Sequence, residues 1–161
     1  MILGLSLVQF TYLHVFLSLV GIGAGVFVVF GLLTSRRLGI ITSLFLVTTA
    51  LTSITGFLFP NSTITPGIIL GVLSLIALIG AIVALYVKRL EGPWRGIYVV
   101  SACLAFYFNF FVLVAQGFAK VPALNTIAPT MSSPGFGFVQ AAVLVIFILL
   151  TIRALKKFHV E

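Results

Sequence analysis

Six hydrogen-bonding side chains at helical spacing are the residues of this chain best suited to chemistry. Each lies in an otherwise apolar stretch, where a polar group that faces hydrocarbon is costly. They form three pairs whose members are three, four or seven positions apart and therefore share one face of a helix. We expect the three faces to converge inside a helical bundle and to line a ligand-binding pocket; the six residues are His14, Ser18, Thr52, Thr55, Asn109 and Gln116.

Each of these side chains also has a purely structural interpretation. Ser and Thr in apolar helices often donate to a carbonyl of their own helix, and Asn or Gln often bridge neighbouring helices. His14 is the most informative of the six, because an ionisable group at membrane depth favours a functional role. A neutral histidine bonded to a neighbouring hydroxyl explains it equally well, so both interpretations stay open.

The acidic residues limit the chemistry in which His14 could take part. The chain has two, Glu91 and Glu161, and both are expected on the opposite side of the membrane from His14. This excludes a Ser-His-Asp triad, a pair of catalytic carboxylates and ion coupling through an intramembrane carboxylate. A zinc site would need three or four ligands, and His14 has no Cys, Asp or Glu near it in depth. We therefore expect no catalytic residue and no metal site, and these residues do not indicate an enzyme.

Haem and quinone are the cofactors that His14 could still hold. A single axial histidine can bind a haem, with Met131 as a second ligand, but no arginine on that side could bind the propionates. An aromatic-rich pocket with Asn109 and Gln116 could bond a quinone carbonyl. Neither ligand has a sequence motif behind it, so no cofactor is predicted.

The elements that position these residues are membrane-spanning helices. The chain has 161 residues, of which 61% are hydrophobic and 7% are charged, and a soluble domain does not have this balance. A spanning helix needs about 20 mostly apolar residues. Five segments meet this length, and they predict one all-α transmembrane domain over residues 1–161: 6–33, 38–59, 66–87, 95–118 and 136–155.

The basic residues predict the orientation of the bundle. Five spans place the loop after the first helix, the loop after the third and the tail on one side, and these carry eight of the nine Lys and Arg residues. Lys120 is the exception. By the positive-inside rule the N-terminus lies outside and the C-terminus in the cytoplasm, as in a multi-pass protein of the bacterial inner membrane. Insertion of the chain into the membrane and contact with anionic lipid at the cytoplasmic face then explain the net charge of +7. A nucleic-acid partner is not expected.

The polar side chains within the spans gather toward the outer side, beneath a long loop. Residues 119–135 contain three prolines, which we expect to stiffen the segment without making it a helix. Its apolar members Val121, Leu124 and Ile127 should pack down onto the bundle. We interpret this segment as a lid over the outer pocket, with Lys120, Asn125 and Met131 as its candidate binding residues.

Two runs of residues carry a resemblance to known proteins. "TTALTSITGFLFP" (48–60) and "FVLVAQGFAKVPALNTIAPT" (111–130) resemble those of a family of small multi-span bacterial inner-membrane proteins that has no assigned activity. The resemblance extends along most of the chain and implies the membrane class. The related pattern has acidic residues shortly after "APT", whereas this chain continues with Met131, Ser132, Ser133 and Pro134. The resemblance brings no catalytic residues.

Together these features predict a non-enzymatic membrane protein, either an accessory subunit or a binding protein. Its outward-facing polar pocket would take a small neutral or apolar ligand, or a segment of a membrane protein partner. One alternative is a transporter or channel formed by a homo-oligomer, because the apolar inner halves of the first, third and fifth helices argue against a pore within one chain. The other alternative is the haem- or quinone-binding redox protein described above.

Overall fold

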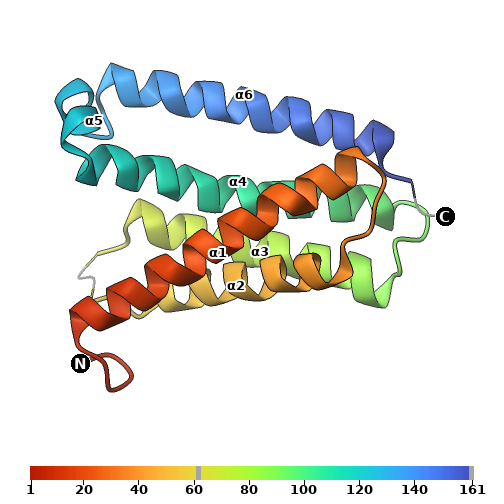
Figure 1. Cartoon of the computed structure of the whole chain (residues 1–161), viewed down its shortest axis with the longest axis horizontal. Helices are drawn as coiled ribbons and strands as arrows, with labels where there is room; N and C mark the ends of the chain where they lie inside the picture. The colour runs from red at the N-terminus through yellow and green to blue at the C-terminus, as the bar shows by residue number, and fades with distance from the viewer. Residues whose placement is uncertain (61–62, 160–161) are drawn as a thin grey trace.

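The computed structural model describes residues 1–60 and 63–159, and this part of the chain forms helices and no strand. Figure 1 shows the helices lying roughly side by side along the long axis of the molecule. In chain order they are α1 (Leu7–Leu33), α2 (Gly39–Phe57), α3 (Pro66–Ile82) with its π-helical continuation η1 (Val83–Val87), α4 (Trp94–Lys120), the short α5 (Pro122–Ile127) and α6 (Pro134–Lys157).

The all-helical fold predicted from the sequence is confirmed. Five helices, with η1 counted as the end of α3, are long and apolar enough to cross a membrane, which suggests a multi-pass membrane protein. Their ends lie within two residues of the predicted ones. Glu161, which we expect in the cytoplasmic tail, lies outside the described residues.

The helix starts follow from local sequence. Ser6 and Gln9 form a capping box at α1, because the Ser6 Oγ accepts from the backbone N–H of Gln9 and the Gln9 amide accepts from that of Ser6. At α3 the hydroxyl of Thr65 accepts from the N–H of Ile68, and Pro66 occupies the first helical position, where its missing N–H costs nothing. These caps fix the N-terminal ends of α1 and α3.

Helix α4 is at the centre of the bundle and contacts α1, α2, α3 and α6. Helix α1 crosses it obliquely, so that α1 begins beside α2 at one end of the molecule and finishes near α6 at the other (Figure 1). The crossing brings the middle of α1 between α2 and α4. His14 and Ser18, two polar residues of α1, therefore lie next to α2 and α4.

Glycines and aromatic rings make the closest helix contacts. Gly25 of α1 packs on the ring of Phe106 in α4, where a Cβ on residue 25 would lie 2.6 Å from a ring carbon. Phe106 in turn packs edge-on against Phe147 of α6, with 5.1 Å between ring centroids, and against Phe45 of α2, with 6.3 Å. Small residues that let helices approach closely are typical of membrane bundles.

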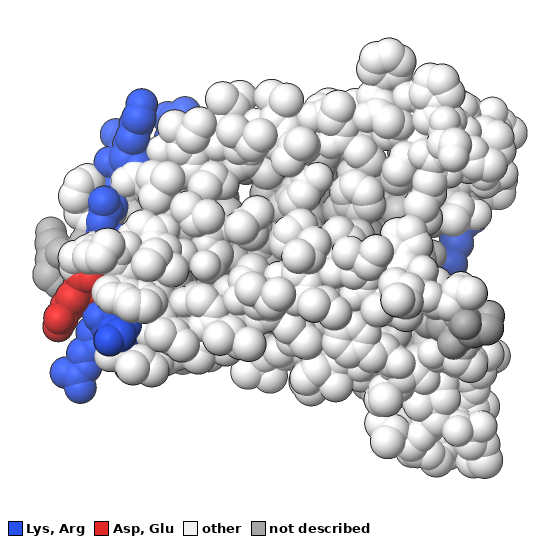
Figure 2. All heavy atoms as spheres, turned by 180° about the vertical axis from the view of Figure 1, so that it is seen from behind, with Lys and Arg blue, Asp and Glu red and all other residues white. Residues whose placement is uncertain are grey.

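The surface of the molecule is apolar along its length and charged at its ends. Large apolar side chains are exposed on every long helix, as expected where lipid covers the bundle. Figure 2 shows Lys and Arg gathered at one end, with one further basic patch at the opposite end, where α4 finishes at Lys120. We call the first of these the basic end.

The segment 119–135 differs from the prediction in two ways. Residues 122–127 form helix α5, so the expectation of a non-helical segment is wrong. Pro122 stands at the first helical position, where proline favours a helix. The expectation that Val121 and Ile127 pack down is also wrong, because both are exposed; Leu124 packs as expected, joined by Ala128 against Phe118 and Phe136.

Candidate functional site

A line of polar side chains runs between α1, α2 and α4. We call it the polar seam and define it as His14, Ser18, Thr48, Thr49, Thr55 and Asn109. The oblique course of α1 creates it, because α1 presents His14 to α2 and, one turn further, Ser18 to α4. The seam is flanked by the aromatic and aliphatic core.

His14 is held by Thr55 and by an aromatic ring. Its Nδ1 lies 2.8 Å from the Oγ1 of Thr55, and its ring stands edge-on to Phe59 with 5.2 Å between centroids. Thr55 Oγ1 is also 2.7 Å from the carbonyl oxygen of Leu51 in its own helix. A hydroxyl has one proton to donate, and a carbonyl can only accept it, so Thr55 donates to Leu51 and accepts from His14. This assigns the proton of a neutral imidazole to Nδ1 and leaves Nε2 as an acceptor.

Ser18 and Asn109 form the second pair. The Ser18 hydroxyl donates to Oδ1 of Asn109 over 2.9 Å and so joins α1 to α4. Asn109 is 6% exposed and its Nδ2 makes no hydrogen bond with any described residue. A buried amide nitrogen without a partner is costly and requires an explanation.

Further polar atoms approach α1 closely at Gly21, and we call this point the notch. A Cβ on residue 21 would lie 3.0 Å from Thr49 Oγ1, 3.1 Å from Thr48 Oγ1 and 3.2 Å from Asn109 Nδ2, so all three atoms face this point of α1. Thr48 donates to the carbonyl of Leu44. Thr49 is 1% exposed, and its hydroxyl, like Nδ2 of Asn109, has no partner among the described residues.

Two of the six residues predicted for the pocket do not join the seam. Thr52 is half-buried and its hydroxyl donates to the carbonyl of Thr48, 2.8 Å away, which is the structural role that threonine often has. Gln116 is exposed. It lies in the C-terminal part of α4, where the buried residue is Phe118, packed toward α6. Residues seven positions apart in a straight helix differ in direction by about 20°, and the elements beside α4 change along its length. Gln116 therefore does not face the same neighbours as Asn109.

No hydrogen bond joins the three residues predicted for the lid to the seam within the described part of the chain. Lys120 and Met131 are exposed, and Asn125 donates through Nδ2 to the carbonyl of Phe118 over 3.2 Å. Helix α5 packs on α4, and Figure 1 shows it at the end of α4 and α6, away from the start of α1. Asn125 thus stabilises the turn after α4.

Sequence reasoning missed several buried polar groups. Thr49 belongs to the seam but was not among the predicted pocket residues, and Gly21, on the same helical face as His14 and Ser18, lies against it. Ser74 on α3 is buried with no partner among the residues described. Gln140 on α6 donates to the carbonyl of Phe111 over 3.1 Å, while its Oε1 is likewise unpartnered within the described chain.

The chemistry available at the seam is neutral hydrogen bonding. It offers an acceptor at His14 Nε2, donors at Asn109 Nδ2 and a hydroxyl at Thr49 that can do either. Over residues 1–60 and 63–159, no three or more His, Cys, Asp or Glu side chains come close enough together to hold a metal ion. The arrangement is suited to binding a polar but uncharged group.

Comparisons of the chain with protein-family models, with curated proteins and with solved structures gave no match.

Proposed function

We propose that this chain is a non-enzymatic protein of the bacterial inner membrane that binds a small neutral or apolar ligand, or a segment of a partner protein, at the polar seam. It would act as a binding protein or as an accessory subunit. The N-terminus lies outside and the C-terminus in the cytoplasm. The eight basic residues at the basic end support this orientation, because Lys and Arg are retained on the cytoplasmic side.

The observation that carries the binding proposal is the pair of unpartnered atoms at Gly21. Thr49 Oγ1 and Asn109 Nδ2 are buried and face one point. Leaving a buried polar group unbonded costs roughly 1–3 kcal/mol. A ligand or a partner side chain that bonds both atoms, together with Nε2 of His14, would remove this cost.

Mass spectrometry of the gently purified protein tests the proposal. The protein is extracted from native membranes in a mild detergent, and co-purifying small molecules and proteins are identified. Asn109→Leu removes the amide of the seam, and Gln116→Leu removes an exposed amide from the same helix as the matched control. We expect a defined companion with the unmodified protein and with Gln116→Leu, and its loss with Asn109→Leu.

A variant with both His14→Ala and Asn109→Ala gives the decisive negative result. If its thermal stability, ligand retention and partner co-purification all match those of the unmodified protein, the seam binds nothing and the proposal fails. Solute flux in proteoliposomes would instead favour the oligomeric transporter. Haem absorbance or an extractable quinone would favour the redox protein.

A further inference from the structure

A cavity of about 610 Å³ lies at the basic end, far from the polar seam. The ends of several helices surround it. The last turns of α1 and the loop after it form one side, the start of α2 and the π-helical η1 form another, and Tyr98 of α4 and Phe158 of the tail complete it. Its volume falls in the range of small-molecule sites, which is roughly 300–1,000 Å³.

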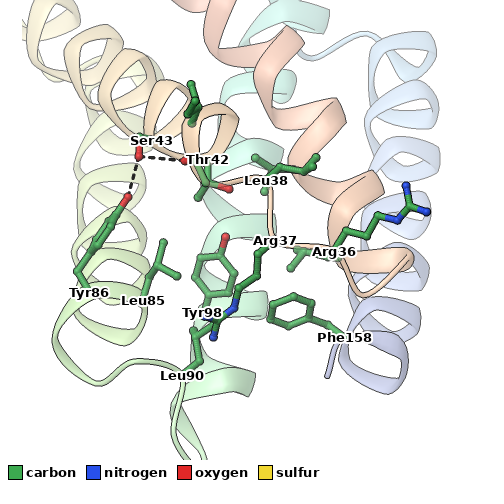
Figure 3. A pocket seen from close by; sticks show the side chains of 14 residues that line it. Arg36, Arg37, Leu38, Thr42, Ser43, Leu85, Tyr86, Leu90, Tyr98 and Phe158 are labelled. Carbon is green, nitrogen blue, oxygen red and sulfur yellow. Dashed lines mark hydrogen bonds between the residues drawn. The ribbon is translucent and has the colours of Figure 1, made fainter. Parts of the chain in front are cut away.

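The cavity has a polar and a basic part. Figure 3 shows Arg37 reaching toward Tyr98 and Leu90, whereas Arg36 extends away toward α6. Tyr98 and Thr42 are both more than nine-tenths buried and turn their hydroxyl groups toward each other. No acidic residue is among those that line the cavity, so the charge of Arg37 is not neutralised there by the described chain.

The remaining walls are apolar. Leucine, isoleucine and valine side chains from α1, α2 and η1 line them, together with the ring of Phe158. A ligand that fills this space must therefore combine an anionic group with an apolar portion. Free inorganic phosphate would leave the apolar walls uncovered.

The tail that closes the cavity is fixed in place. Arg95 Nη1 donates to the carbonyl groups of Leu155 and Phe158. Ser35 Oγ donates to the carbonyl of His159 over 2.9 Å and accepts from its N–H over 2.8 Å. Arg95 is thus engaged in structure, whereas Arg37 lines the cavity and extends toward Tyr98.

We infer that this cavity binds the phosphate of an anionic phospholipid at the cytoplasmic face. Arg37 pairs with the phosphate, the Tyr98 and Thr42 hydroxyls bond its oxygens or the glycerol, and the apolar walls receive the upper part of an acyl chain. The start of α2 adds to the attraction, because its N-cap residue Leu38 makes no side-chain cap and leaves first-turn N–H groups at the cavity. Basic pockets between helices on the cytoplasmic side are suited to phospholipid headgroups.

Lipid retention measured by native mass spectrometry tests this assignment. The full chain is reconstituted in vesicles of equal parts phosphatidylglycerol and phosphatidylethanolamine, extracted, and scored for bound lipid. We expect preferential retention of phosphatidylglycerol. Arg37→Gln should lower it roughly tenfold, the scale of one charge-assisted hydrogen bond. Arg153→Gln removes the same charge from the exposed end of α6, outside the cavity, and should change nothing.

A second variant adds a large side chain at the wall of the cavity and leaves the charge of Arg37 unchanged. Gly39 lines the cavity and a Cβ there would meet no atom within 4 Å, so Gly39→Leu adds a side chain at the cavity wall with free space around its first carbon. It should reduce retention of phosphatidylglycerol at unchanged thermal stability, which keeps the test valid if Arg37→Gln fails to fold.

Three results would overturn the assignment. Equal retention of the two lipids would show no anion preference. Equal loss with Arg37→Gln and Arg153→Gln would show that only the overall charge of the basic end matters. Displacement of the lipid by millimolar inorganic phosphate would assign the site to a soluble phosphate compound.

Discussion

Three glycines on α1 provide the sharpest test of the packing around the polar seam. Gly21, Gly23 and Gly25 lie within one and a half turns of the helix but face different surroundings. Replacing any of them by alanine should favour the helix by about 0.8–1.0 kcal/mol, because glycine is the weaker helix former. The differences between the three variants then report what each new methyl group meets.

The expected order follows from the distances. At residue 23 a Cβ meets nothing within 4 Å, so Gly23→Ala should stabilise the protein by about 1 kcal/mol. At residue 25 three ring atoms of Phe106 lie 2.6–3.0 Å away, and Phe45 and Phe147 hold that ring. Overpacking of this kind costs about 1–3 kcal/mol, so the net effect of Gly25→Ala is destabilisation by up to about 2 kcal/mol.

Gly21→Ala should distinguish an effect on ligand retention from an effect on the stability of the fold. Its methyl would lie 3.0–3.2 Å from Thr49 Oγ1, Thr48 Oγ1 and Asn109 Nδ2, which is a few tenths of an ångström too close. Thr49 has no hydrogen bond to lose within the described chain and can rotate away. A strain of about 1 kcal/mol is then offset by the gain in helix stability. We expect near-neutral stability and lost ligand retention, because the methyl fills the notch.

Thermal unfolding in mild detergent measures the series. For a chain of this size 1 kcal/mol shifts the Tm by roughly 2–4 °C, so Gly23→Ala and Gly25→Ala should differ by several degrees in opposite directions from the unmodified protein. If Gly23→Ala is the most destabilised of the three, the face of α1 that points inward is not the one described here. If Gly21→Ala unfolds as readily as Gly25→Ala, the notch is too rigid to be a binding site.

Three further predictions concern the histidine and the orientation. A double-mutant cycle of His14→Ala and Thr55→Ala should give a coupling of about 0.6 kcal/mol, typical of hydrogen bonds between membrane helices, and a coupling of zero would contradict the 2.8 Å contact. Nitrogen-15 NMR of labelled histidine should show His14 protonated at Nδ1; a neutral ring protonated at Nε2 would refute the donor assignment to Thr55. In a background with Cys103→Ala, a membrane-impermeant maleimide added to intact cells should label Leu3→Cys but not Lys157→Cys, and the reverse pattern would invert the proposed topology.

Helical spacing was sufficient to predict the five long helices and four of the six residues of the seam. The apolar run lengths gave helix ends within two residues, and the spacing of four between His14 and Ser18 indicated a shared inward face. The partner residues Thr55 and Asn109 were also among those predicted to converge with them. Such patterns work because a membrane helix must satisfy its own backbone and turn its polar face away from lipid.

The features that sequence did not predict depend on how neighbours change along a helix. Gln116 shares a spacing with Asn109, but near the end of α4 the adjacent elements are α5 and α6, and its side chain is exposed. The cavity at the basic end is formed by a loop, a π-helical turn and the tail, and no periodic pattern joins them. Thr42 and Tyr98 contribute buried side chains to this cavity, but they were not among the predicted site residues.

The helices of the bundle are joined by contacts that do not involve the seam. Gly25 packs on Phe106 between α1 and α4, Gly80 approaches Ser101 between α3 and α4, and Gly71 approaches Phe57 between α3 and α2. A Cβ at each of these glycines would lie under 3.0 Å from the neighbouring side chain, so the three helix contacts leave no room for a side chain in place of glycine.

Hydrogen bonds between membrane helices add only about 0.6 kcal/mol each on average, and two buried atoms of the seam, Thr49 Oγ1 and Asn109 Nδ2, have no partner among the described residues. Holding the bundle together is therefore a poor explanation for Asn109 and Thr49. An apolar residue of similar size at either position would serve stability at least as well. Their presence is better explained by a group that binds them, and for this reason we expect Asn109→Leu to lose the companion molecule while the protein stays folded.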